Sequence, residues 1–529
     1  MTYRRILSTG LLALALGAVS ATADAQRVLR HDEAAPGRLD PSKVVDYASS
    51  VLAFNVYDTL VEADPRGVAP SLAESWTIAP DGKAYTFKLR AGVKFHGGGE
   101  LTSEDVVFTL ERTQALNAGY ARLFKGMAVA ASDPRTVVFN LPEPNAAFLA
   151  TLVRLPVMQK SLVLKNIKPG NHGDKGDWGE AFLNNSDAGS GAYRIVEHNP
   201  QELSVLQRFD GYFGKFADKA PDVVRIRYGV EPATIRTLMA RREFEATSQW
   251  IPSEIKKALA ESEGMSMMAE QGSGYFIMPM NTRRPPTDDV HFRRAVALGI
   301  DYAALIDLVK ITPSIPGAIP MPGILPSGML GHDKTLPVSR RDVAAAKAEL
   351  AKSKYATDAP VLEIIWVGEV ALEEKIGLLV FQNLAEVGIK ANLTKVPWAL
   401  LTQQATKPES TPNLIQRFVQ APYPDPDSMI AQSHSRSMGT TLKMDWYADP
   451  EVDKMIEAGN AVIDDAKRRE IYSAVQRRLM DAVPNLYPFE TLATFVKQSY
   501  VKAPMLDDVK AGVAAQGGNW RFRTFSVDK

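Results

Sequence analysis

Strand-like segments of this chain lead directly into helix-like segments. Residues 85–90, YTFKLR, alternate apolar and polar side chains, which is the two-residue period of a half-buried strand. Thr102 then precedes a helical apolar period, and Asp105, three residues later, can answer it in a shorter variant of the capping box. Strands that lead into helices favour layers of helices on a sheet, so we expect an α/β fold.

The same two signals recur in reverse order in the second half of the chain. Residues 373–387 place apolar side chains on one helical face, and Gly388 stands where a helix ends. Residues 389–396, IKANLTKV, are typical of a strand. This helix and strand add a second α/β unit to the outline.

Two further helices and one long connection complete the outline. We expect helices at 343–350, with Ser339 as the N-cap, and at 471–482, which ends before Pro484. Ahead of them, residues 312–337 contain six Pro and four Gly and cannot be a helix. This connection either runs over the surface or passes over a cleft, and both interpretations stay open.

The string HGGG at 96–99 resembles the loop that forms an oxyanion hole in lipases and esterases. Such a hole needs a nucleophile beside it, and Gly-x-Ser-x-Gly, which carries the nucleophile in that fold, is absent from the 529 residues, as is Cys. The zinc-protease and P-loop motifs are absent too. We therefore predict that the glycines form the turn after strand 85–90 and supply its positive φ angles. An exported hydrolase is the least favoured alternative.

The first 25 residues predict a secretory signal peptide. Arg4 and Arg5 form a basic start, residues 6–19 form an apolar run, and a small-x-small cleavage site ends at Ala25. A second possible site lies at 21–23. No Cys follows this segment, so no lipid can be attached there. We expect an exported protein of the periplasm without a lipid anchor.

Composition narrows the partners and the domain number. The 61 basic and 61 acidic residues balance and no basic run occurs, so nucleic acid is not an expected partner. The seven His are scattered without the spacing of metal ligands, so we expect no dedicated metal site and no cofactor. Removal of 25 of the 529 residues leaves 504, which corresponds to about three domains at roughly 150 residues each.

Five stretches carry a more specific signal: PSLAESWTIAPDGKAYTFKLRAGVKFHGGGELTSEDVVFTL (70–110), GSGAYRIVEHNPQELSVLQRFDGYFG (189–214), DDVHFRRAVALGIDYAALI (288–306), YPDPDSMI (423–430) and AVQRRLMDAVPNLYPFE (474–490). They resemble the motifs of the extracellular solute-binding proteins of family 5, which are the dipeptide, oligopeptide and nickel receptors of ABC importers. The resemblance extends over the whole mature chain.

The resemblance implies a bilobed α/β periplasmic-binding-protein fold of type II with an additional inserted domain. The expected parts are the signal peptide (1–25), lobe I in three segments (26–57, 188–275 and 491–529), the inserted domain II (58–187) and lobe III (276–490). It further implies a monomeric receptor that closes around a small-molecule solute and docks on the permease subunits of an ABC importer in the inner membrane. A solute receptor for chemotaxis or signalling is an alternative.

Departures from the family bear on the cargo. The peptide receptors place an Asp, which pairs with the α-ammonium of the peptide, three residues before an Asp-Pro pair, and Pro422 stands there in this chain. The Arg that binds the ligand carboxylate in the dipeptide receptor aligns near Val367. Buried, unpaired termini would cost several kcal/mol. We therefore predict a modified or opine-like peptide, a glycoside or a metal chelate as cargo, with an ordinary di- or oligopeptide as the alternative.

The candidate ligand contacts are polar and aromatic residues on segments that face the cleft in the related receptors: Gln249, Trp250, Trp366, Glu369, Trp398, Arg417, Tyr423 and Asp425. Aromatic rings suit both sugar faces and cations. Core packing is the alternative for Trp250 and Trp366. For Asp425 the alternative, which we prefer, is that it only starts the turn at Pro426. Because transport makes no bond, no catalytic residue is expected.

Overall fold

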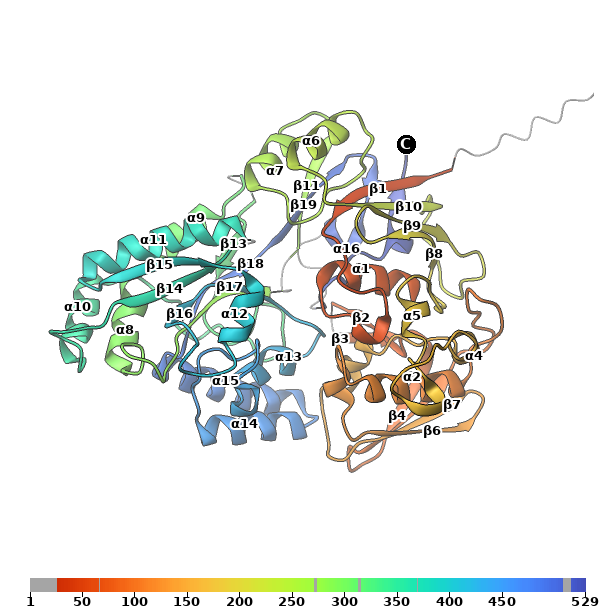
Figure 1. Cartoon of the computed structure of the whole chain (residues 1–529), viewed down its shortest axis with the longest axis horizontal. Coiled ribbons are helices and arrows are strands. Elements are labelled where there is room, and N and C mark those ends of the chain that lie inside the picture. The colour runs from red at the N-terminus through yellow and green to blue at the C-terminus, as the bar shows by residue number, and fades with distance from the viewer. Residues whose placement is uncertain (1–25, 66, 271–273, 313–314, 369, 508–514) are drawn as a thin grey trace, which may run out of the picture.

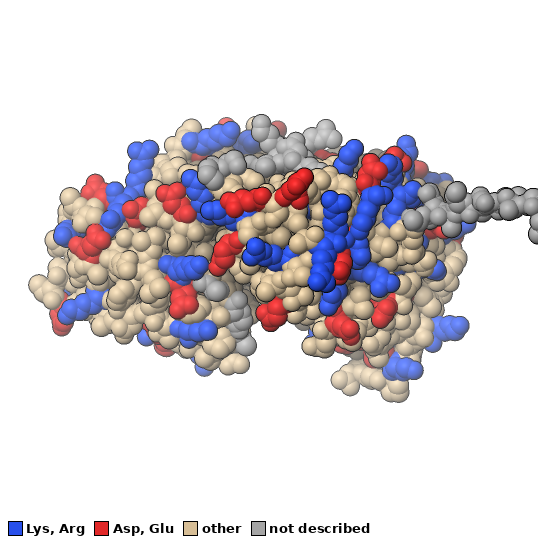
Figure 2. Space-filling model, turned by 90° about the horizontal axis from the view of Figure 1, so that it is seen from above, with Lys and Arg blue, Asp and Glu red and all other residues tan. Residues whose placement is uncertain are grey.

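The computed structural model describes residues 26–65, 67–270, 274–312, 315–368, 370–507 and 515–529. The predicted signal peptide at 1–25 and Glu369 lie outside the described residues. Two halves stand side by side, one formed by the strands and helices from β12 to β18 and the other by both ends of the chain together with residues 58–187 (Figure 1). Seen from above, the outline is indented between the two halves (Figure 2).

Lobe I is built on strands from both ends and the middle of the chain: β1 (Val28–Glu33), β8 (Tyr193–Asn199), β9 (Leu203–Arg208), β10 (Val223–Tyr228), β11 (Met265–Glu270) and β19 (Ala493–Gln498). The order β1-β10-β9-β8 has one parallel pair, β1 with β10, and β11 pairs antiparallel with β19. Single bridges from Ala246 to His31 and to Lys497 join the two groups of strands. Lobe I therefore forms only when distant segments meet.

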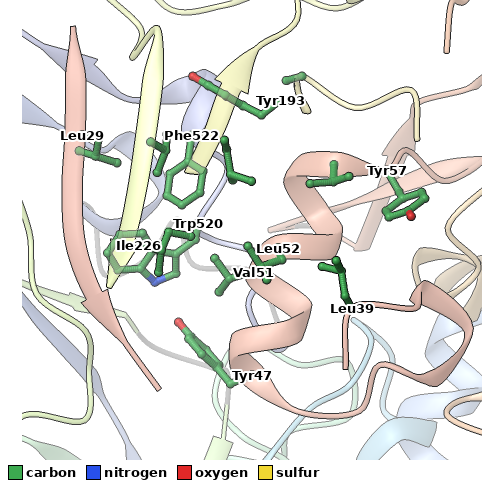
Figure 3. Close-up of a cluster of buried hydrophobic side chains, with 14 of the residues drawn as sticks. Leu29, Leu39, Tyr47, Val51, Leu52, Tyr57, Tyr193, Ile226, Trp520 and Phe522 are labelled. Atoms are coloured by element: carbon green, nitrogen blue, oxygen red, sulfur yellow. The ribbon is translucent and has the colours of Figure 1, made fainter. Parts of the chain in front are cut away.

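Helices and two short strands complete lobe I: α1 (Tyr47–Val56), α6 (Pro232–Ala240), α7 (Ser253–Ala260), α16 (Pro504–Asp507), β20 (Val501–Lys502) and β21 (Ser526–Val527). Figure 3 shows Val51 and Leu52 of α1 pointing toward Ile226 of the sheet and toward Trp520 near the C-terminus. Trp520 is fully buried. The core of lobe I therefore contains side chains from segments more than 450 residues apart in the sequence.

Between α1 and β8 the chain forms a separate region with strands β2 (Val61–Asp64), β3 (Gly67–Pro70), β4 (Ala73–Ile78), β5 (Ala84–Leu89), β6 (Ala128–Asp133) and β7 (Thr136–Asn140) and helices α2 (Ser103–Leu116), α3 (Phe148–Thr151), α4 (Lys160–Lys165) and α5 (Glu180–Leu183). Its main sheet is antiparallel, in the order β4-β5-β7-β6. Tyr85, Phe87 and Leu89 of β5 are buried, which confirms the predicted alternation. The predicted capping box of Thr102 and Asp105 is present at the start of α2.

Lobe III contains two sheets and eight helices among its described residues: β12 (Gly274–Pro279), β13 (Ala318–Pro320), β17 (Arg417–Gln420) and β18 (Asn485–Thr491); β14 (Leu362–Val367), β15 (Ala391–Val396) and β16 (Leu414–Ile415); α8 (Val290–Gly299), α9 (Tyr302–Leu308), α10 (Val343–Lys352), α11 (Ala371–Val387), α12 (Trp398–Gln404), α13 (Asp427–Ile430), α14 (Pro450–Ala461) and α15 (Asp465–Ala482). The first sheet is antiparallel, in the order β13-β18-β12-β17, and the second is parallel, in the order β15-β14-β16.

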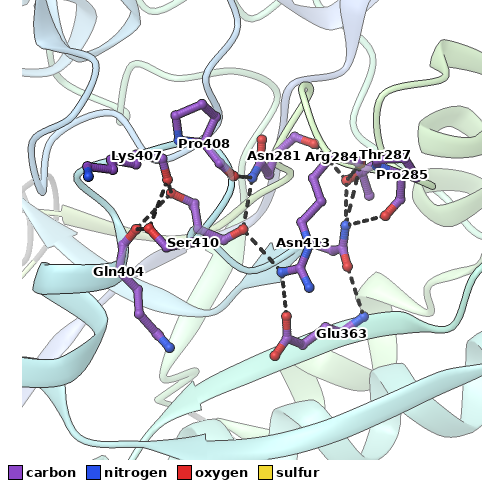
Figure 4. A network of polar contacts seen from close by, with 11 residues as sticks. Asn281, Arg284, Pro285, Thr287, Glu363, Gln404, Lys407, Pro408, Ser410 and Asn413 are labelled. Atoms are coloured by element: carbon purple, nitrogen blue, oxygen red, sulfur yellow. Dashed lines mark hydrogen bonds and ion pairs between the residues drawn. The ribbon is translucent and has the colours of Figure 1, made fainter.

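A polar network fixes the loops at the junction of these two sheets (Figure 4). The Asn281 amide donates to the carbonyls of Pro408 and Thr411 at 2.8 and 2.9 Å, and Arg284 pairs with Glu363 of β14 at 2.6 Å. These contacts hold the segment before β16 against the chain that follows β12. The network therefore fixes the point at which β16 begins, and with it the position of β17.

Two chain passages connect lobe I with lobe III. One leads from β11 to β12, and the other leads from β18 through Leu492 to β19. The strands on each side of the crossing pair antiparallel, β11 with β19 and β12 with β18. The passages lie beside the domain boundaries that we predict at 275/276 and 490/491. Two adjacent passages of this kind allow a hinge motion between the lobes.

The two halves also touch away from the passages. Tyr423 of lobe III packs into the hydrophobic core of the β4–β7 region. The backbone N–H of Ala146 in that region donates to the carbonyl of Asn460 in α14 at 2.8 Å. The N–H of Gln516 donates to the carbonyl of Ala421 at 2.9 Å. Lobe III is thus held to the rest of the molecule at a second place.

Local expectations from the sequence are largely confirmed. α11 ends at Gly388, whose φ is 95°, and Gly98 has φ of 84°. The expected N-cap of α10 is wrong: Asp342, and not Ser339, stands directly before the helix, and its carboxylate accepts from the N–H of Ala345 at 2.9 Å. Ser339 lies too early in the chain to reach the first turn. Among the described residues, no helix has the length and apolar character needed to span a membrane.

Candidate functional site

A pocket with an empty volume of about 240 Å³ lies in lobe III. It is lined by β12, β17 and β18 and by the segments around Ile324, Gln432 and Asp445. Its polar lining includes Tyr275 from β12, Arg417 from β17, Tyr487 from β18, and Gln432 and Asp445 from the loops. Because side chains alternate along a strand, Tyr275 and Ile277 share one face of β12 and both line the pocket. The rings of Tyr275 and Tyr487 lie edge to face at 5.8 Å between centroids.

Arg417 is buried in this pocket and makes no hydrogen bond to a carboxylate among the described residues. Its Nη1 donates to the carbonyl of Thr441, and its Nη2 donates to Gln432 Oε1 at 3.3 Å and to the carbonyl of Leu442 at 3.1 Å. Its Nε has no partner. Burial lowers the pKa of the Arg417 guanidinium. The pocket therefore holds a desolvated cation whose hydrogen bonds are incomplete.

The carboxylates nearest Arg417 have other hydrogen-bond partners. The Asp445 carboxylate is paired with Lys443 at 3.0 Å and accepts from the Asn485 amide at 2.7 Å. The Tyr275 hydroxyl is buried and has no partner, and burial raises its pKa, so it stays protonated and can donate. The hydrogen-bonding capacity of Arg417 and Tyr275 that remains in the pocket can therefore be used by a ligand.

Trp250 and Gln249 lie on a second wall, in lobe I. The Trp250 indole is half exposed, packs edge to face on Tyr47 at 5.5 Å between centroids, and donates to Glu33 Oε1 at 2.6 Å. Glu33 Oε2 and the Gln249 amide nitrogen are buried without partners. Burial raises the pKa of Glu33 to about 8. This wall also has unused hydrogen-bonding groups, here beneath an exposed aromatic ring.

Buried polar contacts tie this wall to the hinge strand β19. The Lys256 ammonium donates to the carbonyl of Gln249 at 2.7 Å and to Thr494 Oγ1 in β19 at 3.0 Å. Thr494 and Tyr487 lie seven residues apart on the passage from β18 to β19, at most about 23 Å for extended chain. The wall in lobe I contacts β19 through Lys256, and the pocket in lobe III is lined by Tyr487 of β18, so each is attached to one of the two strands that this passage joins.

Two further predicted contact residues lie elsewhere in lobe III. Trp366 is buried in β14, where the Lys395 ammonium lies 5.1 Å from its ring centroid. Trp398 is the first residue of α12 and is 39% exposed. Neither residue lines the pocket around Arg417.

Tyr423 and Asp425 are buried and bonded within the fold. The Tyr423 hydroxyl donates to Asp427 Oδ2 at 2.7 Å. Both Asp425 oxygens accept from Arg468, at 2.7 and 3.0 Å, and Oδ1 also accepts from the N–H of Asp427 at 2.9 Å. The carbonyl of Pro422, which stands in the place of the ammonium-binding Asp, accepts from Arg154 Nε. These contacts favour the turn-forming role of Asp425 over a ligand contact.

The HGGG string forms a bonded turn. The His96 ring bonds Asp187 Oδ1 through Nδ1 at 2.6 Å and the carbonyl of Gly191 through Nε2 at 2.8 Å. The backbone N–H groups of His96 and Gly98 donate to the carbonyls of Gly189 and Phe95. Donors engaged in this way cannot stabilise an oxyanion. The turn interpretation therefore fits the contacts of this segment.

A second pocket, with an empty volume of about 350 Å³, lies between α1, the β4–β7 region and the C-terminal segment. Its charged residues already pair with one another: Glu62 accepts from Arg521 and Arg523, and Asp58 accepts from Ser190 and Tyr212. Within the described ranges, no group of three or more His, Asp or Glu converges as metal ligands would. The pocket in lobe III and the wall in lobe I remain the candidate site.

Sequence reasoning missed the residues that complete this site. Tyr275 lies in GYFIMP, an entirely apolar-looking strand, and Glu33 lies in a polar run at the end of β1. A buried Tyr or Glu has no distinctive sequence pattern when its neighbours come from distant segments.

Comparison with known proteins identifies the fold and the family. The family model for bacterial extracellular solute-binding proteins of family 5 matches residues 67–439. The dipeptide-binding protein of Escherichia coli is 25% identical, with 99% of this chain and 98% of that protein covered. A periplasmic binding protein DppA from Helicobacter pylori, solved with the peptide STSA, has a TM-score of 0.79 at 22% identity, covering 95% of this chain and 99% of that one.

A third similar structure has a different ligand. The binding protein AgaA from A. tumefacien R10, solved in complex with agropinic acid, has a TM-score of 0.76 at 19% identity, with 95% of this chain and 99% of that one covered. The bilobed architecture, with its two connecting passages and polar walls, agrees with these structures in fold. The chain belongs to the bacterial extracellular solute-binding proteins of family 5, which are receptors rather than enzymes.

Proposed function

We propose that this protein is a periplasmic receptor that binds a peptide-class solute between lobes I and III and delivers it to the permease of an ABC importer. The observation that carries the mechanism is the pair of adjacent passages between the lobes. Relatives named for dipeptides, and a similar structure solved with a peptide, support the class of cargo. The structure with agropinic acid supports a small organic acid less directly, because it shows similarity of fold only.

The cargo preference drawn from the sequence alone gives way to its alternative. The sequence alone favours a modified or opine-like peptide, a glycoside or a metal chelate, because Pro422 and Val367 replace the charged anchors. The relatives support an ordinary di- or oligopeptide more strongly. The terminal charges of such a peptide would then be bound by other side chains. Arg417, buried with an unpartnered N–H among the described residues, is available for the carboxylate. Glu33, whose pKa burial raises to about 8, is available for the ammonium, and it would lose its proton on forming that pair.

Binding works by differential contact. A solute that touches both walls stabilises the closed arrangement by the interactions made only there. We propose Gln249, Trp250 and Glu33 as contacts from lobe I, and Arg417 and Tyr275 as contacts from lobe III. No bond is made or broken, so the receptor needs no catalytic group. The domain boundaries given above remain part of this proposal.

Export is the first test. We propose cleavage after Ala25, so the mature chain should begin at Gln26 and should be released by osmotic shock. Mass spectrometry of the intact protein measures the mass of the chain. Full-length chain recovered from the cytosol or the membrane would contradict export.

Cargo is the second test. Protein purified without denaturation should carry a peptide detectable by native mass spectrometry, and calorimetry should show submicromolar binding within a pool of di-, tri- and tetrapeptides. A matched pool of glycosides and metal chelates is the control. If these bind while no peptide does, the peptide proposal fails and the earlier preference returns.

A further inference from the structure

The pocket in lobe III is too small for a whole ligand. The space in it that the centre of a water molecule can reach is about 10 Å³, roughly the room of one water. A peptide-class solute would therefore place only one of its groups here, either a chain end or a single side chain. The chemistry of the pocket then decides which group that is.

Three residues that line this pocket have a polar atom without a partner among the described residues, Arg417 (Nε) and Tyr275 and Tyr487 (both hydroxyls), and all three atoms can donate. Arg417 Nε is a buried N–H group, and the Tyr275 hydroxyl is a buried, protonated O–H group. Arg417 is 7% exposed and Tyr275 is fully buried. A buried donor that stays unbonded costs about 1–3 kcal/mol, and a charged one costs more. An acceptor from the ligand would remove both penalties.

The pocket favours a charged acceptor over a neutral one. The hydrogen bonds of the Arg417 guanidinium go to carbonyl and amide oxygens, and the carboxylates of Asp445 and Glu373 act on its charge without a hydrogen bond to it among the described residues. The nearest pocket carboxylate, Asp445, is paired with Lys443. A buried cation without a direct ion pair is costly. An anionic ligand group would supply such a pair.

We infer that this pocket binds a carboxylate of the solute, with Arg417 and Tyr275 as its donors. The inference rests on the proposed function, since it assigns one group of a peptide-class ligand to one place in the receptor. A peptide has two sources of carboxylate, its C-terminus and the side chains of Asp or Glu. Either source gives the same short, charge-assisted hydrogen bonds to the guanidinium.

Three peptides separate these sources by calorimetry: trialanine, trialanine amide, and Ala-Glu-Ala amide. We expect trialanine to bind at least tenfold more tightly than its amide if the C-terminus occupies the pocket. We expect Ala-Glu-Ala amide to bind at least tenfold more tightly than trialanine amide if a side chain does. Equal affinity of all three peptides overturns the inference and leaves the proposed function intact. Failure of all three and of the peptide pool overturns both.

Variants assign the effect to residues. Arg417→Gln should weaken binding of the preferred acid about 10- to 100-fold and remove its advantage over the amide, since a charged hydrogen bond contributes roughly 1.5–3 kcal/mol. Arg417→Lys should restore part of the preference, and Tyr275→Phe should weaken binding less than Arg417→Gln does. Arg477→Gln, at an exposed arginine of the same lobe, is the matched control. An acid preference that survives in Arg417→Gln contradicts the inference.

If Arg417→Gln does not fold, Tyr275→Phe decides, because it removes a single hydroxyl from a side chain of the same shape. Its circular dichroism should match that of the unaltered protein, and its melting temperature should be equal or higher, because the removed hydroxyl has no partner among the described residues. Loss of affinity for the acid but not for the amide supports the inference. An equal change for both peptides overturns it.

Discussion

His96 and Arg417 are both buried side chains with strong hydrogen-bonding groups, and the fold treats them differently. Both ring nitrogens of His96 are bonded, to Asp187 and to the carbonyl of Gly191. Among the described residues, Arg417 keeps an unpartnered Nε and makes no hydrogen bond to a carboxylate. The first residue belongs to a string that resembles a catalytic loop, and the second belongs to a strand without any motif.

The contrast separates structural from ligand-binding groups. A polar group whose bonds are all made within the chain contributes to stability and has nothing left for a ligand. A buried group with bonds left open lowers stability and can gain from a ligand. The resemblance of a string to a known motif does not show which of the two kinds of group a residue is. The hydrogen-bond partners of the residue show it.

Among the changes that test this comparison, removal of the buried pair of Asp425 and Arg468 should have the largest effect on the free energy of unfolding. Asp425→Ala leaves the Arg468 guanidinium buried without its carboxylate, so the free energy of unfolding should fall by about 3–5 kcal/mol. Urea unfolding measures it. Because Asp425 has its bonds within the fold, the folded fraction should bind the preferred peptide as before.

The control for this change is Glu143→Ala. Glu143 is 81% exposed and pairs with Lys83 on the surface, so its removal should change stability by less than about 1 kcal/mol. A large loss of affinity in folded Asp425→Ala would instead restore Asp425 as a ligand contact.

Glu33 tests the other half of the comparison, the buried groups with bonds left open, because its Oε2 has no partner among the described residues. Burial raises its pKa from 4.5 to about 8, and the nearby Asp32 and Asp46 act in the same direction. Above pH 4.5 the unfolded chain releases this proton while the folded chain retains it. The stability that the protonated carboxyl contributes is therefore fully present below pH 4.5 and is lost as the pH rises through about 8.

Glu33→Gln should remove this dependence. Relative to the variant, the unaltered protein should lose about 2–4 kcal/mol of unfolding free energy between pH 5 and pH 8. Urea unfolding at a series of pH values measures the difference. Glu254→Gln, at an exposed position of the same lobe, should run parallel to the unaltered protein. Parallel curves for Glu33→Gln would show that Glu33 ionises normally in the folded protein.

The sequence predicted the features that are set by neighbouring residues. The capping box at Thr102, the helix end at Gly388 and the turn at Gly98 depend on a few adjacent positions, and each is present. The N-cap of α10 failed by three residues because both Ser339 and Asp342 have suitable side chains. Local patterns alone predicted only layers of helices on sheets. The bilobed fold was predicted from the family motifs.

The candidate site could be predicted only in part. Trp250 and Arg417 were named from the segments that carry them, but Tyr275 and Glu33 were not. Tyr275 and Arg417 meet because β12 pairs with β17 across more than 130 residues of sequence. Burial without a partner is a property of that packed arrangement, so no local pattern could reveal it.

Gly98 belongs to the same bonded turn as His96, and its replacement should have a smaller effect on the free energy of unfolding. A Cβ at this position would meet no atom within 4 Å, so the cost of a side chain comes from its φ of 84° alone. Gly98→Val should lower the free energy of unfolding by about 1–2 kcal/mol, and Gly98→Asn should lower it less because Asn tolerates this conformation. Thermal unfolding measures both. Equal losses in the two variants would point to a cause other than backbone strain.

His96→Ala has the smallest expected effect on binding and is the most direct test of the comparison. The change removes two hydrogen bonds and the contact of the ring with Phe209, so stability should fall. None of these partners lines the pocket in lobe III, so the affinity of the folded protein for its preferred peptide should stay within about twofold. Calorimetry at a temperature where both proteins are folded measures the affinity, with His198→Ala as the control at another histidine. A tenfold loss of affinity with an unchanged circular dichroism spectrum would place His96 in a ligand site and defeat the separation drawn from hydrogen-bond partners.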